Sequence, residues 1–356
     1  MKTVATIVGA RPQFVKVAPL SRAIRESGQL NEILIHTGQH FDANMSEVFF
    51  RELGINSPDH SLDIHSGGHG TMTGTMLLRL EPLLQQLSPD IVLVYGDTNS
   101  TLAGAITAAK LHIPIAHVEA GLRSYNRKMP EEINRIVTDH VSEWLFSSTD
   151  TATANLRHEG VPDAKIHQVG DVMYDAALMF SANDSHRNDL CNRLSIRPQK
   201  FVLCTLHRAE NTDNEHRLER IVRALETVAL QLPVVLPLHP RTRAAMARSG
   251  LSFDRVKLID PVGYLDMIAL EASAAVIATD SGGVQKEAFF CKVPCVTLRD
   301  ETEWSELVEL GWNTLAPPEE ADIPNVVLSA VGRRGKDAAP YGEGAAAKAI
   351  VRALTA

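Results

Sequence analysis

Three acidic residues in the first half of the chain stand where a catalytic site could use them. Asp97 and Glu119 each come at the end of a short apolar run, and Glu131 follows a proline a few residues later. General acid and base catalysis needs such carboxylates grouped in a cleft. Asp97 could instead cap a helix, and Glu131 could be an ordinary first-turn helix residue. An unpaired carboxylate at the end of a buried strand is costly, so the pattern favours function for Glu119 and Asp97 in particular.

A glycine turn after the first apolar run carries two cations. The segment GARPQF at 9–14 places Arg11 in the turn, and Lys16 follows one turn into the helix expected next. Cations near a cleft suit an anionic ligand, although a tight turn with a solvated arginine is the alternative. The segment is not the GxGxxG of a dinucleotide-binding fold, which argues against an NAD dehydrogenase.

A second glycine-rich turn, TDSGGVQKE at 279–287, lies between an expected strand and an expected helix. The backbone of Ser281, Gly282 and Gly283 can approach a ligand closely and point free N–H groups at it. The helix dipole favours an anion there, so a phosphate or diphosphate is the expected ligand. Glu287, further into the helix, could accept hydrogen bonds from ribose hydroxyls. A simple helix cap with a tight turn is the alternative.

Two further strand ends in the second half each carry a histidine and an arginine. His207 and Arg208 follow one apolar run, and His239 and Arg241 follow the next. Imidazole and guanidinium groups suit a diphosphate leaving group. A single histidine is commonly structural, but two in equivalent positions favour a shared function.

Composition excludes several classes of protein. The 35 basic and 43 acidic residues give a net charge of −8, which provides no general attraction to nucleic acid or to anionic membranes. No apolar run approaches the roughly 18 residues of a membrane span. The four cysteines show no CxxC and the histidines no HExxH, so we expect neither a metal site nor a cofactor. The N-terminus reads as a first strand without a cleavage site, which predicts a cytoplasmic protein.

The elements that must position these residues alternate between strand and helix along the whole chain. Short β-branched runs at 3–8, 32–36, 91–95, 113–118, 144–147 and 165–169 are separated by amphipathic stretches, and the pattern begins again with runs at 201–206, 234–238, 256–259, 276–279 and 295–298. Alternation of this kind predicts an α/β protein with parallel sheets. With 356 residues, two Rossmann-like domains facing each other across a cleft are expected, with ligands at the carboxyl ends of the strands.

Taken together and in this order, the motifs resemble the non-hydrolysing UDP-N-acetylglucosamine 2-epimerase family. The resemblance covers nearly the whole chain and rests on GARPQF (9–14), GDT (96–98), HVEAGLR (117–123), PEEINR (130–135), HR (207–208), DSGG (280–283) and PYG (340–342). It implies a fold like that of the B-type glycosyltransferases. The N-terminal domain would span 1–170, the UDP-binding domain 171–342, and the C-terminal helix 343–356 would pack back on the first domain.

The resemblance also implies a reaction, the inversion of C2 of a UDP-sugar. Such enzymes eliminate UDP to form a glycal and add UDP back after the proton returns to the other face. The family pattern implies Asp97, Glu119 and Glu131 as the acid–base set and Glu287 as the ribose contact. It also assigns His207 and the Ser281–Gly283 turn, with Arg11 and Lys16, to the diphosphate, while Arg123 and Arg135 are candidates for sugar contacts. A UDP-sugar is thus the expected partner, and a homodimer the usual assembly.

The sequence departs from the commonest family pattern in three segments. GTRPEA is usual where 9–14 reads GARPQF, the TERPE-like segment reads TEWSE at 302–306, and the QHR segment reads GQHFD at 38–42. These variants are more similar to the subgroup that acts on UDP-2,3-diacetamido-2,3-dideoxyglucuronic acid. An acidic sugar calls for a local cation, for which Arg241 is a candidate. UDP-N-acetylglucosamine remains the other possible substrate.

Three alternatives stay open at this stage. A glycosyltransferase of the same fold would use the same donor site but has less use for three carboxylates from one domain. A hydrolysing epimerase would release UDP and the free sugar. A catalytically silent nucleotide-sugar sensor would bind its ligand and tolerate replacement of Asp97 or Glu119.

Overall fold

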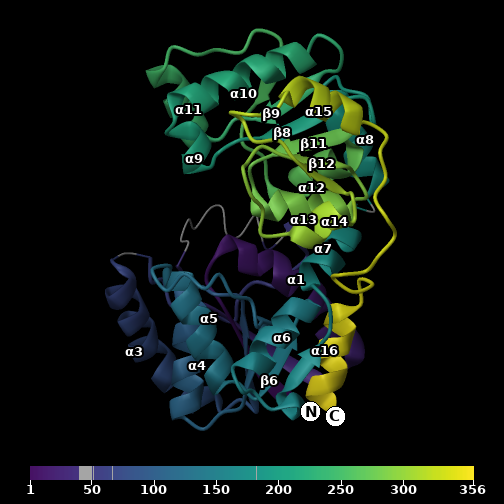
Figure 1. Cartoon of the computed structure of the whole chain (residues 1–356). Coiled ribbons are helices and arrows are strands. Elements are labelled where there is room, and N and C mark those ends of the chain that lie inside the picture. The colour runs from purple at the N-terminus through teal and green to yellow at the C-terminus, as the bar shows by residue number, and fades with distance from the viewer. Residues whose placement is uncertain (40–49, 51, 66, 182) are drawn as a thin grey trace. The chain divides into compact units, whose positions relative to one another are not determined.

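The computed structural model describes residues 1–39, 50, 52–65, 67–181 and 183–356. These residues form two compact units (Figure 1). The first unit comprises Met1–Ala176 together with Ala339–Ala356, and the second comprises Ala177–Ala338. The chain therefore passes between the units twice. Each unit is built on its own parallel sheet.

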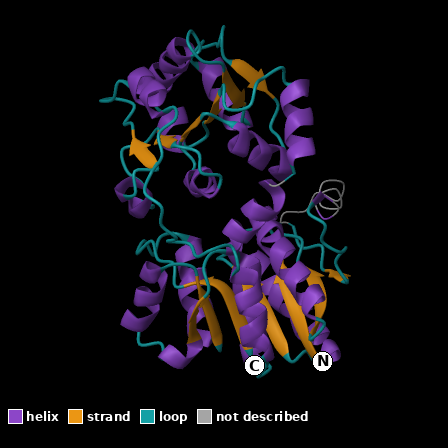
Figure 2. Cartoon of the chain, turned by 90° about the vertical axis from the view of Figure 1, so that its right-hand side faces the viewer, coloured by secondary structure: helices purple, strands orange, loops and turns teal. Residues whose placement is uncertain are grey.

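The first unit holds a parallel sheet in the strand order β3-β2-β1-β4-β5-β6-β7. Its strands are β1 (Lys2–Val8), β2 (Leu30–His36), β3 (His60–Ser61), β4 (Ile91–Tyr95), β5 (Ile115–Ala120), β6 (Trp144–Ser147) and β7 (Ile166–Gln168). All five residues of β4 are buried, as expected for a central parallel strand covered on both faces. Figure 2 shows these strands as one sheet flanked by helices.

Helices connect the strands of the first unit and close its edge. They are α1 (Arg11–Ser27), α3 (His69–Leu87), α4 (Asn99–Lys110), α5 (Pro130–Val141), α6 (Asp150–His158), α7 (Val172–Ser181) and α16 (Ala346–Thr355). The C-terminal α16 packs against α1. Asp175 on α7 accepts hydrogen bonds from the backbone N–H groups of Ala346 and Ala347 at 3.1 and 3.0 Å. It thereby satisfies two otherwise unpaired donors at the start of α16.

The second unit repeats the same topology with six parallel strands in the order β10-β9-β8-β11-β12-β13. The strands are β8 (Val202–Thr205), β9 (Val234–Pro237), β10 (Lys257–Ile259), β11 (Val276–Thr279), β12 (Cys295–Thr297) and β13 (Asn313–Leu315). The helices are α8 (Asp184–Arg193), α9 (Ala209–Thr212), α10 (Glu215–Val228), α11 (Pro240–Arg248), α12 (Tyr264–Ser273), α13 (Gly282–Phe290), α14 (Ser305–Glu309) and α15 (Ile323–Ala330). The apolar faces of α10 and α15 pack with the strands into one core.

Both sheets reverse their direction of winding beside the first strand of the unit. In the first unit the reversal lies between β1 and β4, and in the second between β8 and β11. Ligands of doubly wound sheets bind at such switch points, outside the carboxyl ends of the strands. The predicted α/β class with parallel sheets is thus confirmed. Among the described residues, no helix is both long and apolar enough to cross a membrane.

Candidate functional site

Glu119 lies at a β-bulge close to the switch point of the first unit. The register of β5 against β6 shifts between Val118 and Ala120, and Glu119 has a φ of +75°. A non-glycine residue with positive φ is sterically strained, and such strain gathers at functional sites. A bulge redirects a side chain that would otherwise alternate across the sheet. Glu119, the predicted site residue, is therefore also the residue at which the regular pairing of β5 with β6 is interrupted.

The carboxylate of Glu119 forms an ion pair with the ammonium group of Lys16 on α1. Both side chains are 13% exposed, so the pair is largely shielded but open on one side. Gly96, at the end of β4, leaves room for it. A Cβ at Gly96 would lie 3.2 Å from Glu119 Oε2 and 3.3 Å from Lys16 Nζ. The structure thus brings together two predicted site residues that are 103 positions apart in the sequence.

Asp97 directly follows Gly96 and is held by α5. Its Oδ2 accepts a hydrogen bond from Arg135 at 2.6 Å, and its backbone carbonyl accepts one from Asn134 at 2.8 Å. The Asp97 side chain is 32% exposed, so it stays accessible beside the arginine. Arg135 also donates to Glu132 at 2.9 Å. Arg135, predicted as a sugar contact, is in the structure the residue that orients Asp97.

Glu131 and Glu132 occupy the first turn of α5 but differ in their surroundings. Glu132 is 1% exposed and accepts bonds from the backbone N–H groups of Ser124 and Tyr125, both at 2.9 Å. Burial acts to raise the pKa of Glu132, but these donors and Arg135 outweigh it and leave the pKa lowered. Glu132 therefore anchors the loop before α5, while Glu131, the residue predicted for acid–base chemistry, is partly exposed.

Arg123 is enclosed rather than presented to a ligand. Its side chain is 1% exposed and its Nη2 lies 2.7 Å from Asp139 Oδ2. It also donates from two nitrogens to both carboxylate oxygens of Glu159, each at 2.7 Å. Its Nη1 donates to the Leu122 carbonyl at 2.7 Å, so all three nitrogens of the buried guanidinium already have protein acceptors. The structure therefore does not support the predicted sugar contact of Arg123.

Gln13 organises the glycine turn after β1. Its Oε1 accepts from the backbone N–H groups of Gly9 and Ala10 at 2.8 and 3.0 Å. Its Nε2 donates to the Tyr95 carbonyl at the end of β4 at 2.8 Å. A glutamate, which is usual here in the resembled family, could make the last bond only when protonated. Arg11 begins α1, but its side chain lies outside the described residues, as do positions 40–42 of the GQHFD segment.

In the second unit, a buried aspartate fixes the loop that follows β8. Asp280, at the end of β11, is fully buried and accepts from the backbone N–H groups of His207 and Arg208 at 3.0 and 2.9 Å. It also accepts from Asn211 Nδ2 at 3.2 Å. Charge-assisted hydrogen bonds of this kind are strong, so Asp280 sets the position of His207 and Arg208, the two residues predicted to contact the diphosphate.

The two predicted histidines lie together at the switch point. The rings of His207 and His239 are 5.4 Å apart, and His239 Nδ1 accepts from the backbone N–H of Arg241. Burial lowers the pKa of His207, the charges of His239 and Arg208 lower it further, and Asp280 offsets this only in part. His207 is therefore a neutral imidazole at pH 7, able both to donate and to accept a hydrogen bond.

The serine–glycine turn is clamped by a tryptophan from the TEWSE segment. Ser281 caps α13, and Trp304 Nε1 donates to the Gly282 carbonyl at 2.8 Å. A Cβ at Gly282 would lie 3.5 Å from Arg208 Nη2, an ordinary contact distance, so the guanidinium of Arg208 lies directly beside the turn. Lys286 lies 4.6 Å over the Trp304 ring, a favourable cation–π distance. The tryptophan that replaces the arginine of the usual pattern thus has a structural partner in the turn.

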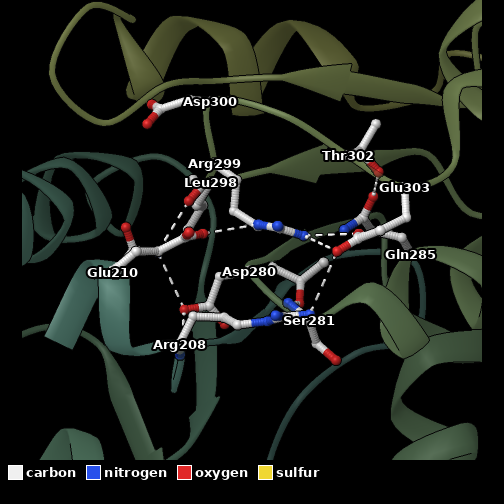
Figure 3. Close-up of polar contacts among 12 residues, drawn as sticks. Arg208, Glu210, Asp280, Ser281, Gln285, Leu298, Arg299, Asp300, Thr302 and Glu303 are labelled. Carbon is white, nitrogen blue, oxygen red and sulfur yellow. Dashed lines mark hydrogen bonds and ion pairs between the residues drawn. The ribbon is translucent and has the colours of Figure 1, made fainter. Parts of the chain in front are cut away.

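Arg299 lies between Glu210 and Glu303, as Figure 3 shows. Its side chain is 6% exposed, and it donates to Glu210 at 2.8 Å and to both oxygens of Glu303 at 3.1 and 2.9 Å. Glu303 also lies 3.8 Å from Arg208 Nη2. Burial acts to raise the pKa of Glu303, but Arg299 and the charge of Arg208 outweigh it, so the pKa is lowered. Glu303 is an ionised acceptor that holds Arg208 beside the Ser281 turn.

Glu287 and Arg241 have partners outside this cluster. Glu287 lies within hydrogen-bonding range of Glu271, a fully buried carboxyl on α12. Burial, and then the charge of Glu287, raise the pKa of Glu271 well above its ordinary value. Glu271 is therefore protonated and can donate to Glu287. Arg241 donates to Thr212 at 2.9 Å and to Asp213 at 2.6 Å, with 44% of its side chain exposed.

Several supporting residues were missed by the sequence reasoning. They are buried polar groups that contact site residues rather than the site itself: Gln13, Glu132, Asp139, Asp280 and Arg299. Asp280 follows a buried strand, as Asp97 does. This position in the sequence could have identified Asp280 as a candidate. Asp139 lies in the last turn of α5, and without knowledge of its distant partners a buried carboxylate there cannot be told from a solvated one.

Comparison with known proteins agrees with this geometry. The family model described as UDP-N-acetylglucosamine 2-epimerase matches residues 22–355. A relative from Pseudomonas aeruginosa, UDP-2,3-diacetamido-2,3-dideoxy-D-glucuronate 2-epimerase, is 53% identical over 355 residues, covering 99% of both chains. The UDP-N-acetylglucosamine 2-epimerase of Methanococcus maripaludis is 43% identical over 360 residues, covering 99% of this chain and 98% of the relative.

Solved structures show the same fold. The UDP-GlcNAc 2-epimerase of Methanocaldococcus jannaschii superposes with a TM-score of 0.90 at 41% identity, covering 99% of each chain. The same enzyme in complex with UDP-GlcNAc and UDP has a TM-score of 0.84, again with 99% coverage of each chain and at 42% identity. The predicted family resemblance is thereby confirmed. This chain belongs to the UDP-N-acetylglucosamine 2-epimerase family.

Proposed function

We propose that this member of the family inverts C2 of UDP-2,3-diacetamido-2,3-dideoxyglucuronic acid without hydrolysing it. In the first half of the reaction a carboxylate removes the C2 proton, the C1–O bond breaks, and UDP leaves with the bonding electron pair. A C1=C2 double bond forms in the sugar. In the second half the UDP oxygen attacks C1 and a proton returns to C2 on the other face. No oxidant or reductant takes part.

The strained Glu119 is the observation that carries this proposal. It combines a positive φ, a partly open ion pair with Lys16 and proximity to Gly96, next to the accessible carboxylate of Asp97. Two carboxylates held by cations can take and return protons at one carbon. Asp97, Glu119 and Glu131 are thus the proposed acid–base set, and the first unit the one that handles the sugar.

The second unit is the proposed holder of UDP. Arg208 beside the Ser281–Gly283 turn, with His207 and His239, offers donors for a departing diphosphate. Glu287, to which Glu271 can donate, is the proposed acceptor for ribose hydroxyls. Lys16 remains a proposed diphosphate contact, as does Arg11, on the resemblance alone.

The choice of the diacetamido uronate rests on similarity and on the TEWSE segment. Identity is 53% to the relative named for that sugar, over 99% of both chains, and 43% to one named UDP-N-acetylglucosamine 2-epimerase. A relative named UDP-N-acetylglucosamine 2-epimerase homolog is also 53% identical, over 88% of both chains, so the longer match is what favours the uronate. Trp304 and Gln13, which depart from the usual pattern, both have well-defined partners. Arg241, with its side chain 44% exposed, is the proposed partner of the sugar carboxylate. On binding, the sugar carboxylate would replace Asp213 as the ion-pair partner of Arg241.

Steady-state kinetics with two sugars test the proposed substrate. The protein is incubated separately with the diacetamido uronate and with UDP-N-acetylglucosamine, and the C2 epimer is followed by NMR. We expect kcat/KM to be roughly tenfold higher, or more, for the uronate than for UDP-N-acetylglucosamine. One hydrogen bond to a charged group, here the sugar carboxylate, stabilises binding by about that factor. Equal or higher kcat/KM for UDP-N-acetylglucosamine would overturn the substrate. Accumulating free UDP would instead indicate hydrolysis or glycosyl transfer.

A homodimer in the cytoplasm is the proposed state of the enzyme, on the strength of the family resemblance. Light scattering during gel filtration tests the assembly, with twice the mass of one chain expected and the mass of a single chain contradicting it. Cell fractionation tests the location.

A further inference from the structure

Another histidine, His117, is buried two residues before Glu119. Each of its ring nitrogens lies within hydrogen-bonding distance of an oxygen atom. Its Nδ1 lies 2.6 Å from Asp139 Oδ1, and its Nε2 lies 2.7 Å from the Gly96 carbonyl oxygen. The side chains of His117 and Asp139 are both fully buried. A carbonyl oxygen only accepts, so Nε2 must carry a proton.

Asp139 is also an acceptor, because its surroundings keep it ionised. Its second oxygen accepts from the Gly121 N–H at 3.1 Å and lies 2.7 Å from Arg123 Nη2. The guanidinium of Arg123, which is always charged, and the Gly121 N–H both favour the carboxylate over the neutral acid. Nδ1 of His117 must then carry a proton as well. A histidine that donates from both nitrogens is an imidazolium.

This buried charge network holds the chain on both sides of Glu119. His117 binds the carbonyl of Gly96, whose N–H donates to the Val118 carbonyl at 3.0 Å. Asp139 binds the N–H of Gly121, two residues after Glu119. A residue with an unfavourable φ persists only where its surroundings fix it. Through Gly96 the network also fixes the chain that leads into Asp97.

We infer that His117 is a positioning residue for the epimerase. As an imidazolium that bridges Gly96 and Asp139, it keeps Glu119 in its strained conformation and Asp97 beside it, without contacting the substrate. The kinetic part of this inference rests on the proposed function, whereas the protonation state of His117 can be measured without it.

The protonation of His117 is tested on the intact wild-type protein. Long-range ¹H–¹⁵N correlation NMR with ¹⁵N-histidine distinguishes rings with one proton from rings with two. The signal is assigned by its loss in His117→Gln, or by its nuclear Overhauser contacts to Gly96 and Asp139 if that variant does not fold. Two protonated nitrogens at the pH of the activity assay support the inference, and a single proton overturns it.

The positioning role is tested by kinetics of two His117 variants. In His117→Ala we expect kcat to fall about 100-fold, with KM and the Kd for UDP within about twofold of wild type, because the carboxylates are displaced and UDP binding is not. His117→Gln retains a donor for the Gly96 carbonyl and should fall in between. His140→Gln, on the exposed side of α5, is the matched control with unchanged kinetics.

The outcomes separate this inference from the proposed function. Wild-type kcat in a folded His117→Ala variant would overturn the positioning role, and so would a loss confined to KM. If neither His117 variant folds, the wild-type NMR result alone decides. If the wild-type enzyme epimerises neither UDP-sugar, the proposed function fails, while the doubly protonated ring would still be observed.

Discussion

Glu119 shows how much structure a single catalytic carboxylate requires. Its backbone is strained, its side chain is paired with Lys16, and the space it occupies exists because residue 96 lacks a side chain. The same residue in a regular strand would point across the sheet instead.

Asp280 gives a first prediction at this scale. Asp280→Asn keeps the shape but replaces a charged acceptor with an amide that can present only one acceptor oxygen to the His207 and Arg208 N–H groups. We expect the Kd for UDP to rise about tenfold, because hydrogen bonds to charged groups contribute more than about 1.4 kcal/mol. Isothermal titration calorimetry with UDP measures this.

The control for that variant is Asp260→Asn, since Asp260 is 96% exposed and paired only loosely with Arg243. Its UDP affinity should match that of the wild type. An unchanged Kd in a folded Asp280→Asn variant would contradict the role assigned to Asp280.

Glu271 gives a second prediction, on stability. Its pKa is raised in the folded protein above the ordinary 4.5, so the unfolded chain releases this proton first as pH increases. The native state then holds more protons than the unfolded state, and this group lowers stability as pH rises above about 4.5. Glu271→Gln removes the effect. Urea unfolding at about pH 5 and pH 8 should show the variant gaining stability relative to the wild type at the higher pH. A difference independent of pH would contradict the assignment.

Sequence position was sufficient to predict Asp97, Glu119 and His207 as site candidates, because each stands at or just beyond the carboxyl end of a buried strand of a parallel sheet. Their partners were not predictable. Lys16 and Glu119 are 103 residues apart, and Arg299 and Glu210 are 89 apart, so only the folded topology brings them together. The enclosure of Arg123, predicted as a sugar contact, was not foreseeable for the same reason, because its two carboxylate partners lie on other elements.

At the scale of elements, the ends of β4 and β5 are linked by hydrogen bonds to each other and to α5. Gly96 is held at its N–H by the Val118 carbonyl and at its own carbonyl by His117, and α5 supplies the residues that hold Asp97. The loop carrying Asp97 and the bulge carrying Glu119 are therefore fixed to each other. This rigidity matters because catalytic groups displaced by about 1 Å lose much of their effect.

Gly96→Ala tests this arrangement with an internal control. Gly96 and Gly28 share a φ of +62°, but a Cβ at Gly28 would meet nothing within 4 Å. Both alanine variants should lose about 1–2 kcal/mol of stability from the left-handed backbone alone. Only Gly96→Ala should also lose activity, because its Cβ presses on Glu119 and Lys16. Thermal unfolding and kcat separate the two effects, and equal activity in both variants would contradict the crowding argument.

Most elements were predictable because parallel strands are continuous apolar runs, as in β4, and the helices between them are amphipathic. Two strands were missed. β3 consists of only His60–Ser61, and β13 of Asn313–Leu315, which carries polar residues because it lies at the sheet edge. Short edge strands leave almost no pattern in a sequence. The bulge in β5 was also missed, since the predicted run ends at Val118, whereas the strand continues past the bulge to Ala120.

At the scale of the whole molecule, the two units have separate tasks in the proposed reaction. The first carries the carboxylates, together with Lys16 and Arg11 as proposed contacts to the diphosphate, and the second carries the histidines, Arg208 and the N–H donors proposed for UDP. Glu119→Gln should therefore abolish epimerisation while the Kd for UDP stays within about twofold of wild type, the converse of Asp280→Asn. Calorimetry and kinetics on both variants check this. A large loss of UDP affinity in Glu119→Gln would contradict the division.

The central claim, reversible proton exchange at C2 by the first unit's carboxylates, is tested most directly in D2O. The wild-type enzyme is incubated with the diacetamido uronate, and C2 and the UDP linkage are followed by NMR. We predict deuterium at C2 of both epimers with the UDP linkage intact, and no deuterium with Glu119→Gln. Epimer that keeps its original hydrogen at C2 would contradict the account, because inversion would then proceed without a protein carboxylate removing that proton.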